Sequence, residues 1–285
     1  MKHKYQSTNP LRNYFLTIIT RNRLDFKNIF HQLRQETCFA LKIDSFLKEI
    51  LSKKKIDRLY LPYESQTFQN KIILTAKAYN KRIKVYGYDH SIDALPINNI
   101  YKSPSPDFLY IHSHAQKNIY IKFLKWPKKK VINIPSLRFL KKGKKFFDQK
   151  IFLPYNILSK NEKIKNFEIF LNCLSPKKIK PFDVRIHPIQ KNSKEHNLFK
   201  EEINDLMKSY NNIFSTTSKH SYSVFFGATS SVIEALENGS NVIHVVENAT
   251  FETYSNKLWP SINVKMINKN IFKYTLKTKK KCITF

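Results

Sequence analysis

The clearest structural signal in this chain is the segment Tyr222-Ser-Val-Phe-Phe-Gly-Ala-Thr-Ser-Ser-Val-Ile-Glu-Ala-Leu236. Its first part is a short apolar run rich in aromatic and β-branched residues, which predicts a buried strand. Its second part predicts a helix over Ser230–Asn238, with Gly239 as the C-terminal cap. A strand that turns directly into a helix indicates an α/β fold with a parallel sheet, in which ligands bind at the carboxyl ends of the strands.

The turn between this strand and helix contains Gly227 and three hydroxyl side chains, Thr229, Ser230 and Ser231. A helix N-terminus presents unpaired N–H groups and a partial positive charge, so the turn is a candidate phosphate-binding site. The hydroxyls would donate to phosphate oxygens. The alternative is that Thr229 or Ser230 simply caps the helix. The sequence leaves both interpretations open.

The rest of the chain alternates strand-like and helix-like segments, which also indicates an α/β fold. The predicted strands are 13–20, 58–62, 82–87, 107–112, 130–134, 150–154, 182–187, 222–226 and 241–246. The predicted helices are 39–52, 69–80, 115–124, 160–174, 201–210 and 230–238. The basic, glycine-containing stretch Leu140–Lys145 is the best linker candidate. The sequence therefore predicts two Rossmann-like lobes, 1–145 and 146–285, facing a cleft.

Charge and cysteine content restrict the class of protein further. The 285 residues include 51 Lys and Arg but 21 Asp and Glu, a formal net charge of +30, which favours anionic partners such as nucleic acid, acidic lipid or phosphorylated and acidic-sugar substrates. Compositional drift in an AT-rich genome is the alternative source of the excess lysine. Three widely spaced cysteines predict neither a disulfide framework nor a zinc site, and favour a reducing cytoplasm. The sequence has no run of about 18 apolar residues, and its N-terminal apolar run lacks a signal-peptide cleavage site.

His187 is the second candidate functional residue, in the segment Val184-Arg-Ile-His-Pro188. Pro188 ends the predicted strand, which places His187 at a strand's carboxyl end. An imidazole there could neutralise or protonate a departing phosphate. Arg185 alternates with His187 and could support the same anion, although a solvated basic side chain is the commoner role.

The order Arg-Ile-His-Pro, then Gly-Ala-Thr-Ser-Ser, resembles the HP and SS/ST motif pair of bacterial sialyltransferases and related capsule or lipooligosaccharide glycosyltransferases. The resemblance covers residues 150–285. It implies a GT-B fold, in which a C-terminal lobe binds a nucleotide-sugar and an N-terminal lobe binds the acceptor. It also implies a CMP-activated acidic sugar, with His187 at the leaving phosphate and Thr229, Ser230 and Ser231 holding it. In that family, groups near Glu247 contact the nucleotide. At about 140 residues the N-terminal lobe is short for this class, so an incomplete lobe is one expectation.

The predicted N-terminal lobe offers two candidate bases. Glu64, in Tyr60-Leu-Pro-Tyr-Glu-Ser-Gln-Thr-Phe-Gln69, follows a predicted buried strand and is placed to take a proton from an acceptor hydroxyl. This segment resembles the YED/YEG turn of the same transferases and the YExQxWE stretch of surface-carbohydrate biosynthesis proteins, with Ser65 and Gln69 as departures. Asp89 is the rival base and His90 a candidate acceptor contact, or both belong to an ordinary Asp-containing turn.

Together these features predict an inverting, metal-independent glycosyltransferase of cell-surface polysaccharide or lipopolysaccharide synthesis. The donor would be a CMP-linked sialic acid, another nonulosonic acid or Kdo, with no further cofactor. The acceptor would be a glycan or lipid-linked glycan, and the enzyme would be cytoplasmic or peripheral at an anionic membrane. Three alternatives stay open: a CDP-polyol phosphotransferase of teichoic-acid type, a basic nucleic-acid-binding protein and an inactive lobe of such an enzyme.

Overall fold

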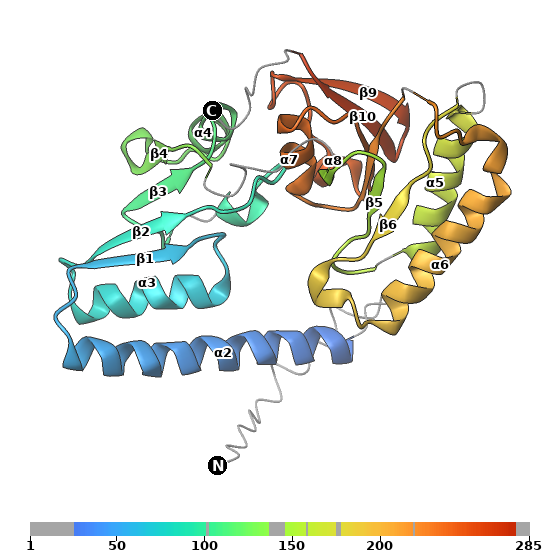
Figure 1. Cartoon of the computed structure of the whole chain (residues 1–285). Coiled ribbons are helices and arrows are strands. Elements are labelled where there is room, and N and C mark those ends of the chain that lie inside the picture. Colours follow the sequence, from blue (N-terminus) through green and yellow to red (C-terminus); the bar gives the residue numbers. More distant parts are fainter. Residues whose placement is uncertain are drawn as a thin grey trace. The chain divides into compact units, whose positions relative to one another are not determined.

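The computed structural model describes residues 26–100, 103–136, 146–157, 159–174, 178–218 and 220–277. The predicted strand 13–20 and the predicted linker Leu140–Lys145 lie outside these residues. Within the described ranges, the chain is an α/β protein with two sheets (Figure 1).

The first sheet has four parallel strands in the order β1-β2-β3-β4. The strands are β1 (Arg58–Pro62), β2 (Lys84–Tyr88), β3 (Phe108–Ile111) and β4 (Val131–Asn133). Because all four run in the same direction, the residues that follow them emerge at one edge of the sheet (Figure 1).

The second sheet is mixed and has the order β6-β5-β7-β8-β10-β9. The strands are β5 (Lys150–Phe152), β6 (Asp183–Arg185), β7 (Ser223–Phe226), β8 (Val242–Val245), β9 (Ile262–Asn268) and β10 (Ile271–Leu276). The first four are parallel, whereas β10 pairs antiparallel with both β8 and β9. The carboxyl ends of β5, β6, β7 and β8 therefore share one edge.

The α-helices of the described ranges are α2 (Phe26–Lys53), α3 (Thr67–Tyr79), α4 (His114–Asn118), α5 (Lys160–Leu174), α6 (Lys194–Ser209), α7 (Ser231–Glu237) and α8 (Ala249–Glu252). A π-helical turn, Ile119–Phe123, continues α4. Among these described helices, none combines the length and apolarity that a membrane span requires.

Contacts divide the chain into two compact units. The first contains the described part of 1–56 together with 66–83, and so holds α2 and α3. The second contains 57–65 and the described part of 84–285, and so holds both sheets.

The second sheet is built around β7, whose four residues are all buried. Phe226 packs edge-on against Phe167 of α5 and Phe199 of α6, with ring centroids 6.0 and 5.7 Å apart. On the other side of the strand, Phe225 stacks on Phe152 of β5 at 4.7 Å. A strand buried on both faces explains why this segment reads as a continuous apolar run.

Each strand predicted within the described residues is confirmed, with ends shifted by up to two residues. The helix predicted at 160–174 is confirmed, and α6 begins seven residues earlier than predicted because Ser193 Oγ caps it by accepting from His196 N. The hairpin of β9 and β10 was not predicted. Its strands are partly exposed and mix Lys and Asn with apolar residues, which weakens the periodic signal.

Aromatic side chains line one face of the first sheet. Tyr86 of β2 stacks on Tyr60 of β1 at 4.7 Å and on Phe108 and Tyr110 of β3 at 5.3 and 6.1 Å. Such cross-strand pairs stabilise the sheet and fix its register, because a one-residue slip would bring each ring to the opposite face.

Candidate functional site

Glu64 and His90 lie together at the carboxyl ends of β1 and β2. The paired register of these strands continues past their ends, where Tyr63 N donates to Tyr88 O at 2.8 Å. Glu64 Oε1 then lies 3.4 Å from His90 Nε2, and the two side chains are 20% and 45% exposed. Among the described residues, His90 Nδ1 is a buried atom without a hydrogen-bond partner. The structure thus joins two predicted site residues into a solvent-accessible carboxylate–imidazole pair.

Asp89 is buried, with only 2% of its surface exposed, whereas the side chain of its neighbour His90 is partly exposed. Its Oδ2 accepts from Tyr120 Oη at 2.6 Å and from Gln116 Nε2 at 3.0 Å. Desolvation by burial is the largest effect on this carboxyl and raises its pKa well above the ordinary value of 3.8, against the opposing hydrogen bond from Tyr120. A buried carboxyl held by these two donors fixes the turn that carries His90.

The turn after β7 is held by backbone contacts with β8. Gly227 has a φ of +68°, a conformation that favours glycine, and its N–H donates to Val245 O at 2.8 Å. Its carbonyl oxygen lies 2.7 Å from His244 Nε2. Burial lowers the pKa of His244 to about 4, so the ring is neutral near pH 7 and donates from Nε2.

Thr229, Ser230 and Ser231 occupy the predicted start of α7. Thr229 Oγ1 accepts from Ser231 N at 3.2 Å, a contact within the turn, whereas the N-cap residue of α7 is Ser230, whose side chain makes no capping hydrogen bond. Ser230 is buried and Ser231 is half-buried. The helix that begins here has seven residues.

His187 follows β6, the outer strand of the second sheet, and its side chain is exposed. Its ring packs edge-on against Tyr155, which follows β5, and its Nδ1 accepts from Ile189 N at 3.4 Å. The neutral ring therefore carries its proton on Nε2. Because β5 lies between β6 and β7, two strand spacings, about 10 Å, separate the strand ends that carry His187 and the Gly227–Ser231 turn.

The two remaining candidates form ion pairs. Arg185 pairs with Asp183 at 2.7 Å, and both side chains are more than half exposed. Glu247, at the end of β8, pairs with Lys163 of α5, whose side chain is almost fully buried. A buried ammonium needs such a partner, so Glu247 has a structural task at this strand end.

Tyr254 connects the loop that follows β2 with the turn that follows β7. Its hydroxyl lies 2.7 Å from the carbonyl oxygen of Ile92 and 3.2 Å from that of Thr229. Close by in the sequence, Trp259 Nε1 donates to Ala94 O at 3.0 Å. Since Ile92 is two residues from His90, these contacts bring the carboxyl-end segments of the two sheets together.

Sequence reasoning did not identify Tyr254, His244 or Lys163. Tyr254 and Trp259 belong to a polar-rich stretch without a motif, and only long-range contacts reveal their partners. His244 stands in a predicted buried strand, where a single ionisable residue in an apolar run was the available signal.

In the described ranges, no three His, Cys, Asp or Glu side chains are grouped closely enough to hold a metal ion. No family model matches the chain, and no curated protein matches it significantly.

We predict that Asp89→Asn removes a pH-dependent part of the stability. Because burial raises the pKa of Asp89 in the folded state, the unfolded chain releases this proton first as the pH rises above about 4. The free energy of unfolding of the wild type should therefore fall relative to that of Asp89→Asn as the pH rises, by up to about 1.4 kcal/mol per pH unit. Urea unfolding at pH 5, 6, 7 and 8 measures this difference.

The exposed Asp205→Asn is the matched control and should show no such trend. A difference between wild type and Asp89→Asn that stays constant with pH would contradict the prediction.

Proposed function

We propose that this protein is a GT-B glycosyltransferase of cell-surface polysaccharide or lipopolysaccharide synthesis. It would transfer an acidic sugar, a sialic or other nonulosonic acid or Kdo, from a CMP donor to a glycan or lipid-linked acceptor with inversion. The described residues form an α/β protein with two sheets, an architecture compatible with a fold of two lobes.

The observation that carries the proposal is the contact of the Tyr254 hydroxyl with both Ile92 O and Thr229 O. Through it, the loop that contains Ile92, two residues after His90, is connected to the turn that contains Gly227 and the hydroxyl side chains. Chemistry on a nucleotide-sugar needs a base on the acceptor side and an anion-stabilising group on the leaving side.

On the acceptor side, Glu64 would accept the proton of the acceptor hydroxyl. His90, 3.4 Å away, would hold the carboxylate in place through Nε2 on the acceptor side. The acceptor oxygen would form a bond to the anomeric carbon while the bond from that carbon to the phosphate oxygen breaks.

On the donor side, the leaving CMP would take the electron pair and develop charge on its phosphate. The N–H groups and hydroxyls of the Gly227–Ser231 turn would stabilise this charge, and His187 would donate its Nε2 proton. About 10 Å between the strand ends leaves room for the phosphate between the His187 ring and the turn, each of which would reach toward it from its own strand end. In this scheme the charge is neutralised without a metal ion.

A CDP-polyol phosphotransferase would release the same leaving group, CMP, so the donor that the enzyme accepts distinguishes this activity from that of a glycosyltransferase.

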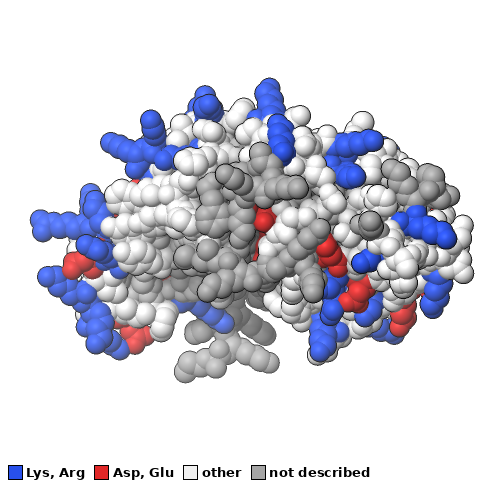
Figure 2. All heavy atoms as spheres, turned by 45° about the horizontal axis from the view of Figure 1, so that its top comes forward, with Lys and Arg blue, Asp and Glu red and all other residues white. Residues whose placement is uncertain are grey.

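A nucleic-acid-binding function is less favoured because, on the face that Figure 2 shows, the Lys and Arg side chains are scattered and do not form one stripe.

We predict that CMP stabilises the protein more than CDP, UDP or GDP in a thermal-shift screen. Ligand at a hundred times its Kd stabilises the folded state by about 2.7 kcal/mol through mass action. Ser230→Ala with Ser231→Ala should weaken CMP binding at least about tenfold, because each lost hydrogen bond costs about 1 kcal/mol. Ser209→Ala with Ser215→Ala is the control. Preference for another nucleotide, or unchanged CMP affinity in the Ser230/Ser231 double variant, would refute this part of the proposal.

We predict that Glu64→Gln lowers turnover of CMP-N-acetylneuraminic acid with a lactoside acceptor about 10²- to 10⁴-fold, the usual contribution of a general base. CMP affinity should be unchanged, because Glu64 lies on the acceptor side. Glu201→Gln, an exposed carboxylate on α6, is the control. If Asp89→Asn abolishes turnover and Glu64→Gln does not, the base has been assigned to the wrong residue.

We predict that His187→Ala lowers the same turnover about a hundredfold while the melting temperature stays within a degree or two, since the ring is exposed. His220→Ala removes another exposed imidazole and should have no effect. Unchanged turnover in His187→Ala would remove this residue from the mechanism.

A further inference from the structure

Over residues 37–53 of α2, the buried side chains lie on one side of the helix. The buried residues Ala40, Asp44, Leu47 and Leu51 follow a helical spacing. Asp44 accepts from Thr75 Oγ1 of α3 and pairs with Lys48 and Lys71, and the hydrogen bonds from Thr75 and Lys48 lower its pKa to about 2. These contacts fix which side of α2 faces α3.

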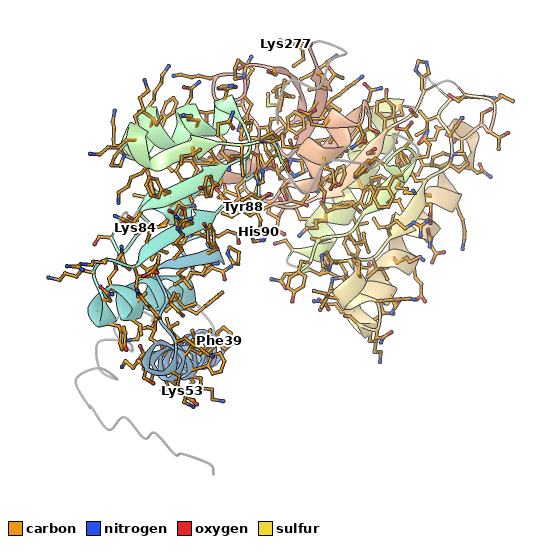
Figure 3. The ribbon with its side chains drawn as sticks, turned by 60° about the vertical axis from the view of Figure 1, so that its left-hand side comes forward. Phe39, Lys53, Lys84, Tyr88, His90 and Lys277 are labelled. Carbon is orange, nitrogen blue, oxygen red and sulfur yellow. The ribbon has the colours of Figure 1, made fainter. Side chains whose placement is uncertain are left out.

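Another side of α2 exposes two phenylalanines and two lysines. Phe39 lies at the border of this side, since its ring also packs edge-on against Phe68 of α3 with ring centroids 5.3 Å apart, and Lys53 pairs with the exposed Glu49 at 2.6 Å. Phe39, Lys42, Phe46 and Lys53 stand at positions i, i+3, i+7 and i+14, within about 60° of one another around the helix at 100° per residue. Phe39 is 52% and Phe46 64% exposed. Figure 3 views α2 closer to end-on and labels Phe39 and Lys53. We call Phe39, Lys42, Phe46 and Lys53 the α2 stripe.

Exposed apolar side chains are concentrated on this helix pair. Of the fifteen large hydrophobic side chains that the described residues expose, five lie on α2 and α3: Phe39, Leu41, Phe46, Leu74 and Tyr79. Of these five, Phe39 and Phe46 share the α2 stripe, whereas Leu41 projects about 140–160° away from them around the helix and Leu74 and Tyr79 belong to α3.

The net positive charge of the same unit favours an anionic partner. Residues 37–56 and 66–83 contain nine Lys and Arg and two acidic residues, a formal charge of +7. A second copy of the chain would bring +7 against +7, so self-association through this surface is electrostatically opposed. An anionic bilayer matches both properties, because aromatic rings enter the headgroup region while lysines reach lipid phosphates.

We propose that the α2 stripe docks this protein on the surface of an anionic phospholipid bilayer, with Phe39 and Phe46 inserted at the headgroup level. The helix lies in the interface and does not cross the bilayer. This inference is independent of the enzymatic proposal, because it uses no residue of the candidate site.

Vesicle binding of the full chain tests the proposal. Wild type should co-sediment with vesicles of 30% phosphatidylglycerol in phosphatidylcholine, and not with pure phosphatidylcholine. Phe39→Ser with Phe46→Ser should lower the partition coefficient at least about tenfold, since each inserted ring removes over 100 Å² of apolar surface from water. Phe251→Ser with Met266→Ser, which changes two exposed apolar residues on α8 and β9, is the matched control and should bind as wild type does.

Insertion depth separates docking by this stripe from general attraction of a protein of charge +30. Phe46→Trp should be quenched by brominated phosphatidylglycerol, while Met266→Trp should not. The native Trp126 and Trp259 are buried and give a constant background.

Three results would overturn the proposal: equal binding of the double phenylalanine variant and wild type, equal quenching at positions 46 and 266, or no binding to anionic vesicles. Light scattering tests the alternative partner, a second copy of the chain. A dimer that dissociates in Phe39→Ser with Phe46→Ser would identify that second copy as the partner.

Discussion

The hydroxyl of Tyr254 is the contact on which the candidate site depends. It lies within hydrogen-bond distance of two carbonyl oxygens, Ile92 O and Thr229 O, that belong to the carboxyl-end segments of different sheets. The single hydroxyl proton can be donated to one of them at a time, and Thr229 O also accepts from Val232 N at 3.4 Å. One phenol therefore couples the position of the loop that carries His90 to the position of the Gly227–Ser231 turn.

Around this contact, buried ionisable groups act as neutral or paired supports. Asp89 is held by Tyr120 and Gln116 with a raised pKa, His244 is kept neutral beside Gly227, and Lys163 is paired with Glu247. Groups of this kind fix backbone segments at strand ends. Glu64, His90 and His187 are more exposed than these groups, with Glu64 and His90 paired to each other, and they are the side chains to which the proposed mechanism assigns the chemistry.

The large positive charge has two separate consequences in this molecule. On the face that Figure 2 shows, the Lys and Arg side chains are scattered, which suits weak attraction of anionic substrates. On the helix pair, the same charge accompanies exposed phenylalanines, and the combination is more specific than charge alone. An enzyme that acts on lipid-linked acceptors would benefit from such a surface, because it would hold the protein where its acceptor is found.

The sequence alone was sufficient for the α/β class, for the strands β1 to β8 and for candidate residues at strand ends, because buried parallel strands read as short apolar runs and strand-to-helix turns have a recognisable composition. It could not show that Asp89 is buried while Glu64 is partly exposed, since both follow a strand; the burial of Asp89 depends on Tyr120 and Gln116, residues far along the chain. Nor could it join Glu64 to His90, or Ile92 to Thr229 through Tyr254. Those pairings depend on strand order and on contacts across 25 to more than 160 residues, which local periodicity does not encode, and only the tertiary structure decided them.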